Sequence, residues 1–179
     1  GDALTSTSMT YADDLLALAQ SLPQQNTEAW ARRSASTACY AVFHLIVETA
    51  VSSRGPKANL PAQNYARRMP THTFLKATCG LLVPKPGQAA PIDAPKAWKE
   101  AGCSGSVAPA ISGFAELVLA LHAGRERADY DLANVFTVLD ADLLQQQASE
   151  VFAVVRAGLP DPQWTLFLTT VLLGQRRAA

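Results

Sequence analysis

The feature that most constrains the fold is a run of helical periodicity from about Thr27 to Ser53. Apolar or small side chains recur there every three or four residues, which is the spacing of one face of an α-helix: Trp30, Ala38, Ala41, Val42, Leu45, Ile46 and Thr49. Asn26 or Thr27 is suited to cap the first turn, and Gly55-Pro56 ends the pattern. About 27 residues at about 1.5 Å each span roughly 40 Å, so we expect this helix to be the central strut of the domain.

The rest of the chain predicts further helices and no strands. We expect them over about 9–22, 62–81 with a break near Pro70, 109–127, 140–157 and 162–176. Thr10 with Asp13 indicates a capping box, Asp140 or Asp142 is the expected cap of the fifth helix, and Asp161 that of the last. The predicted fold class is all-α, an antiparallel up-and-down bundle of five to six helices. One domain covers 1–179, with its core at about 9–157, a long loop at 83–108 and an appended C-terminal helix at 162–176.

Composition narrows the function classes. Lys plus Arg equals Asp plus Glu at 15 each, which argues against tight non-specific nucleic-acid binding. The three cysteines are scattered without a CxxC pair, which favours a reducing compartment over a disulfide framework. No targeting segment is visible, and the apolar stretch Trp164–Leu173 is about half the length of a membrane span. We therefore expect a cytoplasmic protein with no membrane contact, whose last apolar stretch belongs to its own core or to a dimer interface.

A polar line follows one flank of the long helix. Arg33, Ser36 or Thr37, Tyr40 and His44 step by three or four residues, so they lie along one side. Arginine offers a fixed cation and forked donors for phosphate, and histidine can move a proton near neutral pH. The alternative is that Arg33 and His44 only hydrogen-bond neighbouring helices and fix their register.

A second polar group lies in the segment His122-Ala-Gly-Arg-Glu-Arg-Ala-Asp-Tyr-Asp131. His122, Arg125 and Asp129 fall at i, i+3 and i+7, which is again one face of a helix. Two arginines, a histidine, a tyrosine and acids within ten residues are dense for this apolar chain. The alternative is a charged helix end with local salt bridges.

Together the two segments resemble the HEPN family (higher eukaryotes and prokaryotes nucleotide-binding). The matching motifs are Arg33-Ser-Ala-Ser-Thr-Ala-Cys-Tyr-Ala-Val-Phe-His44 and Arg125-Glu-Arg-Ala-Asp-Tyr-Asp131, with Cys39 where the family commonly has a tyrosine. The resemblance implies a helical bundle, often dimeric, in which both motifs line a cleft. Many HEPN proteins are metal-independent ribonucleases with a histidine four to six residues after the arginine. Here Tyr130 stands in that place.

These observations leave three hypotheses. The first is a nucleotide-, RNA- or partner-binding module of a bacterial toxin–antitoxin or defence system, without the usual catalytic histidine, with a homodimer or a nucleotidyltransferase-type antitoxin as partner. The second is a metal-independent endoribonuclease, and the third a purely structural bundle. The expected ligand- and phosphate-binding residues are Arg33, Tyr40, Arg125, Arg127 and Asp129, and the candidates for proton transfer are His44, His122 and Tyr130.

We expect neither a cofactor nor a metal. The three histidines, His44, His72 and His122, are scattered along the sequence. The chain has no HExxH motif, no GxGxxG and no phosphate loop with Gly-Lys-Ser/Thr.

Overall fold

The computed structural model describes residues 10–22, 27–57, 60–159 and 162–173, and these residues form α-helices and no β-strand. The helices are α1 Tyr11–Ser21, α2 Glu28–Arg54, α3 Leu60–Arg68, α4 His72–Gly80, α5 Lys96–Glu100, α6 Pro109–Tyr130, α7 Val138–Ala157 and α8 Gln163–Leu173. The predicted all-α class is therefore confirmed.

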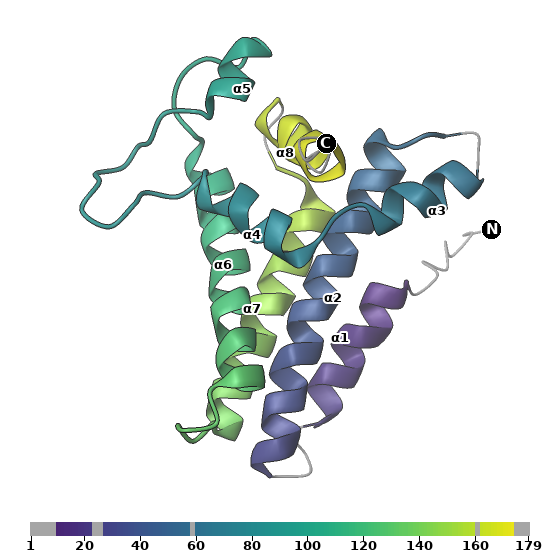
Figure 1. The fold of residues 1–179 in the computed structure, drawn as a ribbon, viewed down its shortest axis with the longest axis vertical. Coiled ribbons are helices and arrows are strands. Elements are labelled where there is room, and N and C mark those ends of the chain that lie inside the picture. Colours follow the sequence, from purple (N-terminus) through teal and green to yellow (C-terminus); the bar gives the residue numbers. More distant parts are fainter. Residues whose placement is uncertain (1–9, 23–26, 58–59, 160–161, 174–179) are drawn as a thin grey trace, which may run out of the picture.

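Helix α2 is the centre of the molecule, as predicted. It packs against α1, α6, α7 and α8, and α1 and α6 run opposite to α2 and α7 (Figure 1). Small residues on α2 let these neighbours approach closely, because the distance between helix axes depends on the side chains at the contact. Among the described helices α2 alone is long and apolar enough to cross a membrane, but 78% of its apolar window is buried inside the bundle. Its place in the core accounts for its hydropathy.

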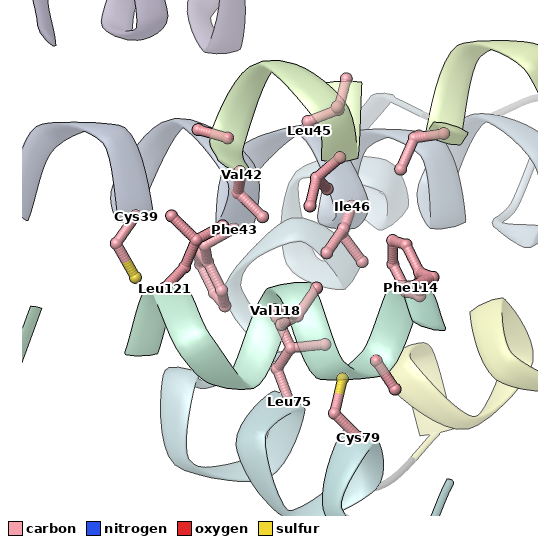
Figure 2. Close-up of a cluster of buried hydrophobic side chains, with 14 of the residues drawn as sticks. Cys39, Val42, Phe43, Leu45, Ile46, Leu75, Cys79, Phe114, Val118 and Leu121 are labelled. Atoms are coloured by element: carbon pink, nitrogen blue, oxygen red, sulfur yellow. The ribbon is translucent and has the colours of Figure 1, made fainter. Parts of the chain in front are cut away.

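One cluster of buried hydrophobic side chains lies where α2, α4 and α6 meet (Figure 2). The buried side chains of this region come from three helices: Cys39, Val42, Phe43, Leu45 and Ile46 from α2, Leu75 and Cys79 from α4, and Phe114, Val118 and Leu121 from α6. Burying an aliphatic or aromatic side chain contributes about 1.5–3 kcal/mol. This packing fixes the relative positions of the two polar motifs, one on α2 and one on α6.

Two helix starts follow the sequence prediction and a third does not. Thr10 and Asp13 form the expected capping box at α1, and the Thr27 hydroxyl caps α2. The predicted cap of α7, Asp140 or Asp142, is wrong. Thr137 is the N-cap, and Asp140 is its capping-box partner three residues later. Thr137 takes the cap because its extended backbone and hydroxyl satisfy the free N–H groups of the first turn.

The predicted helix over 62–81 is divided into α3 and α4. The division falls at Met69-Pro70, because proline lacks the N–H that a continuing helix requires. Thr71 then caps α4 by accepting a hydrogen bond from the backbone of Phe74. With the short helix α5 inside the long loop, this division gives more helices than the five to six expected.

The loop over 83–108 is anchored to the rest of the fold through α8. Trp98 is buried, and its indole N–H donates to the Thr170 hydroxyl at 3.3 Å. The Gln163 side chain accepts from the Ala108 N–H at 2.8 Å and donates to the Ser106 carbonyl at 2.9 Å. The loop and the last helix therefore stabilise each other's position.

Helix α8 packs into its own bundle. Phe167 is fully buried, and its ring lies 5.3 Å from those of both Phe114 and Trp164. Of the two locations expected for this apolar stretch, the structure shows the core. The expected cap Asp161 and the expected helix end at 174–176 lie outside the described residues.

Candidate functional site

The two polar motifs meet between α2 and α6. The Ser36 hydroxyl donates to one oxygen of the Asp129 carboxylate, and Arg125 Nε donates to the other oxygen at 3.1 Å. Arg125 also donates to the Tyr40 hydroxyl at 3.3 Å, and its guanidinium lies 4.9 Å from the centroid of the Tyr40 ring. A hydrogen-bonded chain thus runs from Ser36 through Asp129 and Arg125 to Tyr40, and it holds the Tyr40 ring in one place.

Tyr40 also forms part of a groove between α1 and α2. The groove has a volume of about 450 Å³ and is lined by Tyr11, Leu15, Leu18, Leu22, Trp30, Arg33, Ser36, Thr37, Tyr40 and His44. The whole polar line predicted on α2 therefore lines one groove. Leucines of α1 form its apolar wall, and aromatic rings from both helices border it.

Arg33 contributes a positive charge to this groove. It is exposed, and within the described part of the chain its side chain makes no hydrogen bond, ion pair or cation–π contact. The alternative in which Arg33 hydrogen-bonds a neighbouring helix is therefore not what the structure shows. An unpaired guanidinium beside apolar and aromatic surface is suited to bind an anionic group of a ligand.

The neighbouring residue, Arg32, makes the contacts that sequence reasoning considered for Arg33. Its guanidinium donates to the Glu28 carboxylate at 2.7 Å and to the backbone carbonyls of Ala128 at 2.9 Å and Asn134 at 2.7 Å. It also lies 5.5 Å from the Phe136 ring centroid. Arg32 therefore joins α2 to the connection between α6 and α7. Residue type alone gave no signal to tell these two arginines apart.

His44 is the histidine of the groove. It is half-buried, and its ring packs edge-on against Tyr11 at 4.9 Å between centroids. Burial lowers the pKa of His44, so the ring is neutral at pH 7. A neutral imidazole can accept a proton, and His44 is the only one of the three proton-transfer candidates that lines this groove.

The other predicted residues lie elsewhere. His122 is 3% exposed and packs edge-on against His72, inside the bundle. Tyr130 is 73% exposed at the end of α6, where it borders a shallow depression with Arg127. Arg127 pairs with Asp140 and therefore joins α6 to α7. The structure places none of these three residues in the groove: His122 faces α4, Arg127 faces α7, and Tyr130 is exposed at the end of α6.

A cluster of metal-binding residue types is also present, although the sequence positions gave no sign of it. One donor atom each from Cys39, His72 and His122 lies within 4.8 Å of the other two. These residues come from α2, α4 and α6. The expectation of no metal was drawn from the scattered sequence positions of the histidines, whereas this convergence comes from the packing of α2 and α4 on α6.

Comparison of the chain with protein-family models, with curated protein sequences and with solved structures found no match. The functional argument therefore depends on the geometry above.

Proposed function

We propose that this chain is a HEPN-like nucleotide-binding module that holds a nucleotide, or one end of a single-stranded RNA, in the groove between α1 and α2. The observation that carries the proposal is the unpaired Arg33 beside the aromatic rings of Trp30 and Tyr40. Such a groove offers a cation for phosphate and a face on which a base can stack. Up-and-down bundle topology of the HEPN type is part of the same proposal.

Stacking supplies most of the affinity that we expect. Trp30 is 42% exposed and Tyr40 37% exposed, so part of each ring is open to a ligand. A base stacked on an aromatic side chain gains about 1–3 kcal/mol and does so with little sequence preference. Arg125 contributes to stacking indirectly, because it hydrogen-bonds the Tyr40 hydroxyl and is itself held by Asp129.

Charge limits the ligand to few phosphates. The formal net charge is zero, and among the described residues that line the groove Arg33 is the one arginine or lysine. For single strands, log K falls by about 0.7 per unit of log salt concentration for each phosphate contacted. A groove with one or two phosphate contacts therefore predicts weak salt dependence and a short ligand.

Isothermal titration calorimetry with AMP and with adenosine tests the proposal. AMP should bind and adenosine should bind more weakly, because only AMP carries the phosphate. Arg33→Ala should weaken AMP binding about tenfold or more, as expected for a charge-assisted hydrogen bond. Arg68→Ala is the control, because Arg68 is an exposed arginine of α3 that does not line the groove. Equal affinity for AMP and adenosine, or equal loss in both variants, would contradict the proposal.

A metal-independent ribonuclease is the second candidate, and the position of His44 favours it. His44 lines the groove with Arg33 and Tyr40, where a bound ribose hydroxyl could meet a neutral imidazole. RNA incubated with the protein in EDTA should then be cleaved, and His44→Ala should abolish cleavage. Intact RNA in the presence of folded wild-type protein would leave binding as the function.

Partner binding is the third part of the proposal, within a toxin–antitoxin or defence system. Apolar residues are exposed where α6 connects to α7: Leu132, Val135, Leu139 and Leu143. We propose this surface for the homodimer, because Trp164, Phe167, Leu168 and Val171 of α8 are buried in the core. Leu139→Glu should shift the sedimentation coefficient from dimer to monomer. A monomeric wild-type chain would instead leave this surface to a nucleotidyltransferase-type antitoxin.

A further inference from the structure

Three helices bring soft metal-binding side chains to one buried point. Cys39 is in the middle of α2, His72 is the first residue of α4, and His122 lies on α6. One donor atom from each lies within 4.8 Å of the others. Cys39 is 2% exposed and His122 3% exposed, so two of the three donors are shielded from water. A cysteine and two histidines are the ligand types that zinc prefers.

The ring of His72 gives an independent reason to expect a ligand at this point. Both of its ring nitrogens are buried, and neither has a hydrogen-bond partner. Buried polar atoms are nearly always satisfied, because a lone buried donor or acceptor is destabilising. A metal ion that accepts the lone pair of His72 would remove this penalty at one nitrogen.

We propose that Cys39, His72 and His122 form a three-ligand site for a transition-metal ion of the zinc class. In a tetrahedral zinc site with bonds of about 2.0–2.3 Å, neighbouring ligand atoms lie roughly 3.3–3.7 Å apart. Because the donor atoms lie within 4.8 Å of one another, no pair needs to close by more than about 1–1.5 Å to reach this geometry. Side-chain rotation can supply this closure, since His72 begins its helix and is packed less tightly than the other two.

The local charges are compatible with a cation. The charged side chains that act on the cluster are Arg125, Lys76, Glu126 and Asp129, two positive and two negative, so their formal sum is zero. Arg125 is paired with Asp129 and Lys76 with Glu126, which weakens the repulsion that either cation would exert. Thiolate formation at Cys39 on binding releases one proton and leaves a site charge of about +1 for zinc.

The site has a structural consequence and a chemical one. Bound metal would cross-link α4 to α2 and α6, and α4 is a short helix of 9 residues. Three protein ligands leave a fourth coordination position open, which in zinc proteins is taken by water or another ligand. The site differs from the groove between α1 and α2, because none of the three residues lines that groove. It can therefore exist whether or not nucleotides bind.

Cobalt substitution tests the site directly. The untagged full chain is stripped with EDTA, dialysed and titrated with Co²⁺. Tetrahedral Co²⁺ bound by a thiolate gives a charge-transfer band in the near ultraviolet and intense visible bands. We expect saturation at one Co²⁺ per chain, displacement by Zn²⁺, and a higher Tm with either metal.

The variants assign the ligands. Cys39→Ala should remove the charge-transfer band, and His72→Asn should weaken metal binding at least tenfold. Cys79→Ala and His44→Ala are the matched controls. Both should keep the charge-transfer band and the metal affinity of the wild type, because Cys79 and His44 lie outside the cluster. Helical circular dichroism establishes folding, and His72→Asn serves if Cys39→Ala does not fold. A folded wild-type chain without the band, a band that survives Cys39→Ala, or undiminished affinity in His72→Asn would overturn the site and leave His72 as an aromatic filler stacked on Phe43.

Discussion

At the scale of single residues, two adjacent arginines have opposite roles. Arg32 donates to a carboxylate and to backbone carbonyls, whereas Arg33 has no partner in the described chain. Arg32→Ala should therefore lower the free energy of unfolding by about 1–3 kcal/mol, because it leaves acceptors unpaired. Arg33→Ala should stay within about 0.5 kcal/mol of the wild type, as for other exposed substitutions. Urea unfolding of both variants measures this, and equal losses would contradict the assignment of roles.

Stability should also depend on pH through the buried histidines. Burial chiefly, with the nearby charge of Arg125, lowers the pKa of His72 to about 4 from its ordinary 6.5. The unfolded chain therefore binds this proton more tightly than the folded one, so the folded state loses stability as pH falls from about 6.5 through about 4. Burial lowers the pKa of His44 and His122 in the same direction.

The measurement is urea unfolding in EDTA at about pH 7 and at about pH 5. At about pH 5, His72 is mostly protonated in the unfolded chain and mostly neutral in the folded one. His72→Phe keeps an aromatic ring against Phe43 and removes the titrating group. It should make the loss of stability on acidification smaller than in the wild type. An unchanged pH dependence would show that His72 is not a source of it.

The candidate site was predictable where one helix sets the geometry. Arg33, Tyr40 and His44 share a flank because of helical period alone, and they line one groove. His122 and Arg125 share a face of α6 in the same way, but the neighbours of that face decide what each does. His122 meets α4 and is buried, and Arg125 meets Tyr40. No sequence spacing could show this, since it depends on how the helices pack.

At the scale of helices, two glycines of α6 provide a matched pair. A Cβ added at Gly124 would lie 2.6 Å from Leu144 Cδ1 on α7, whereas one at Gly113 would meet nothing within 4 Å. Gly113→Ala should stabilise the protein by up to about 1 kcal/mol through helix propensity. Gly124→Ala gains the same propensity but overpacks the α6–α7 contact, at a cost of about 1–3 kcal/mol.

We therefore expect Gly124→Ala to lower the free energy of unfolding by about 1 kcal/mol net. Chemical denaturation of the two variants should give opposite signs. Adding Leu144→Ala to Gly124→Ala should remove the clash, so the two substitutions together should cost less than the sum of the two alone. Stabilisation by Gly124→Ala would show that α6 and α7 can separate without penalty.

Element boundaries were predictable where local chemistry decides them. The hydroxyls of Thr10 and Thr27 cap α1 and α2, and Pro70 separates α3 from α4. The start of α7 was misjudged because Thr137 and Asp140 both suit a cap. Only the extended backbone at Thr137 distinguishes the cap from its partner in the first turn. The docking of the 83–108 loop on α8 depends on contacts distant in sequence, such as Trp98 with Thr170, and no local rule predicts them.

At the scale of the whole molecule, α8 belongs to the core. Phe167 is fully buried against Phe114 and Trp164. Phe167→Ala should lower the free energy of unfolding by about 3–5 kcal/mol, which is typical of a buried aromatic residue. The same change at the exposed Leu173 should cost much less, because that side chain is 57% exposed. Equal, small effects in thermal denaturation would mean that α8 is not an integral part of the bundle.

The groove between α1 and α2 is the central claim, and its own fluorophore can test it. Trp30 borders the groove, whereas Trp98 and Trp164 are 3% and 8% exposed. Titration with AMP should therefore quench tryptophan fluorescence to saturation through Trp30. Trp30→Phe should lose the quenching. Arg33→Ala should raise the AMP concentration for half-maximal quenching about tenfold or more, and Arg68→Ala should match the wild type. Absence of saturable quenching in the wild type, or the same titration curve in Arg33→Ala, would contradict a nucleotide site in this groove.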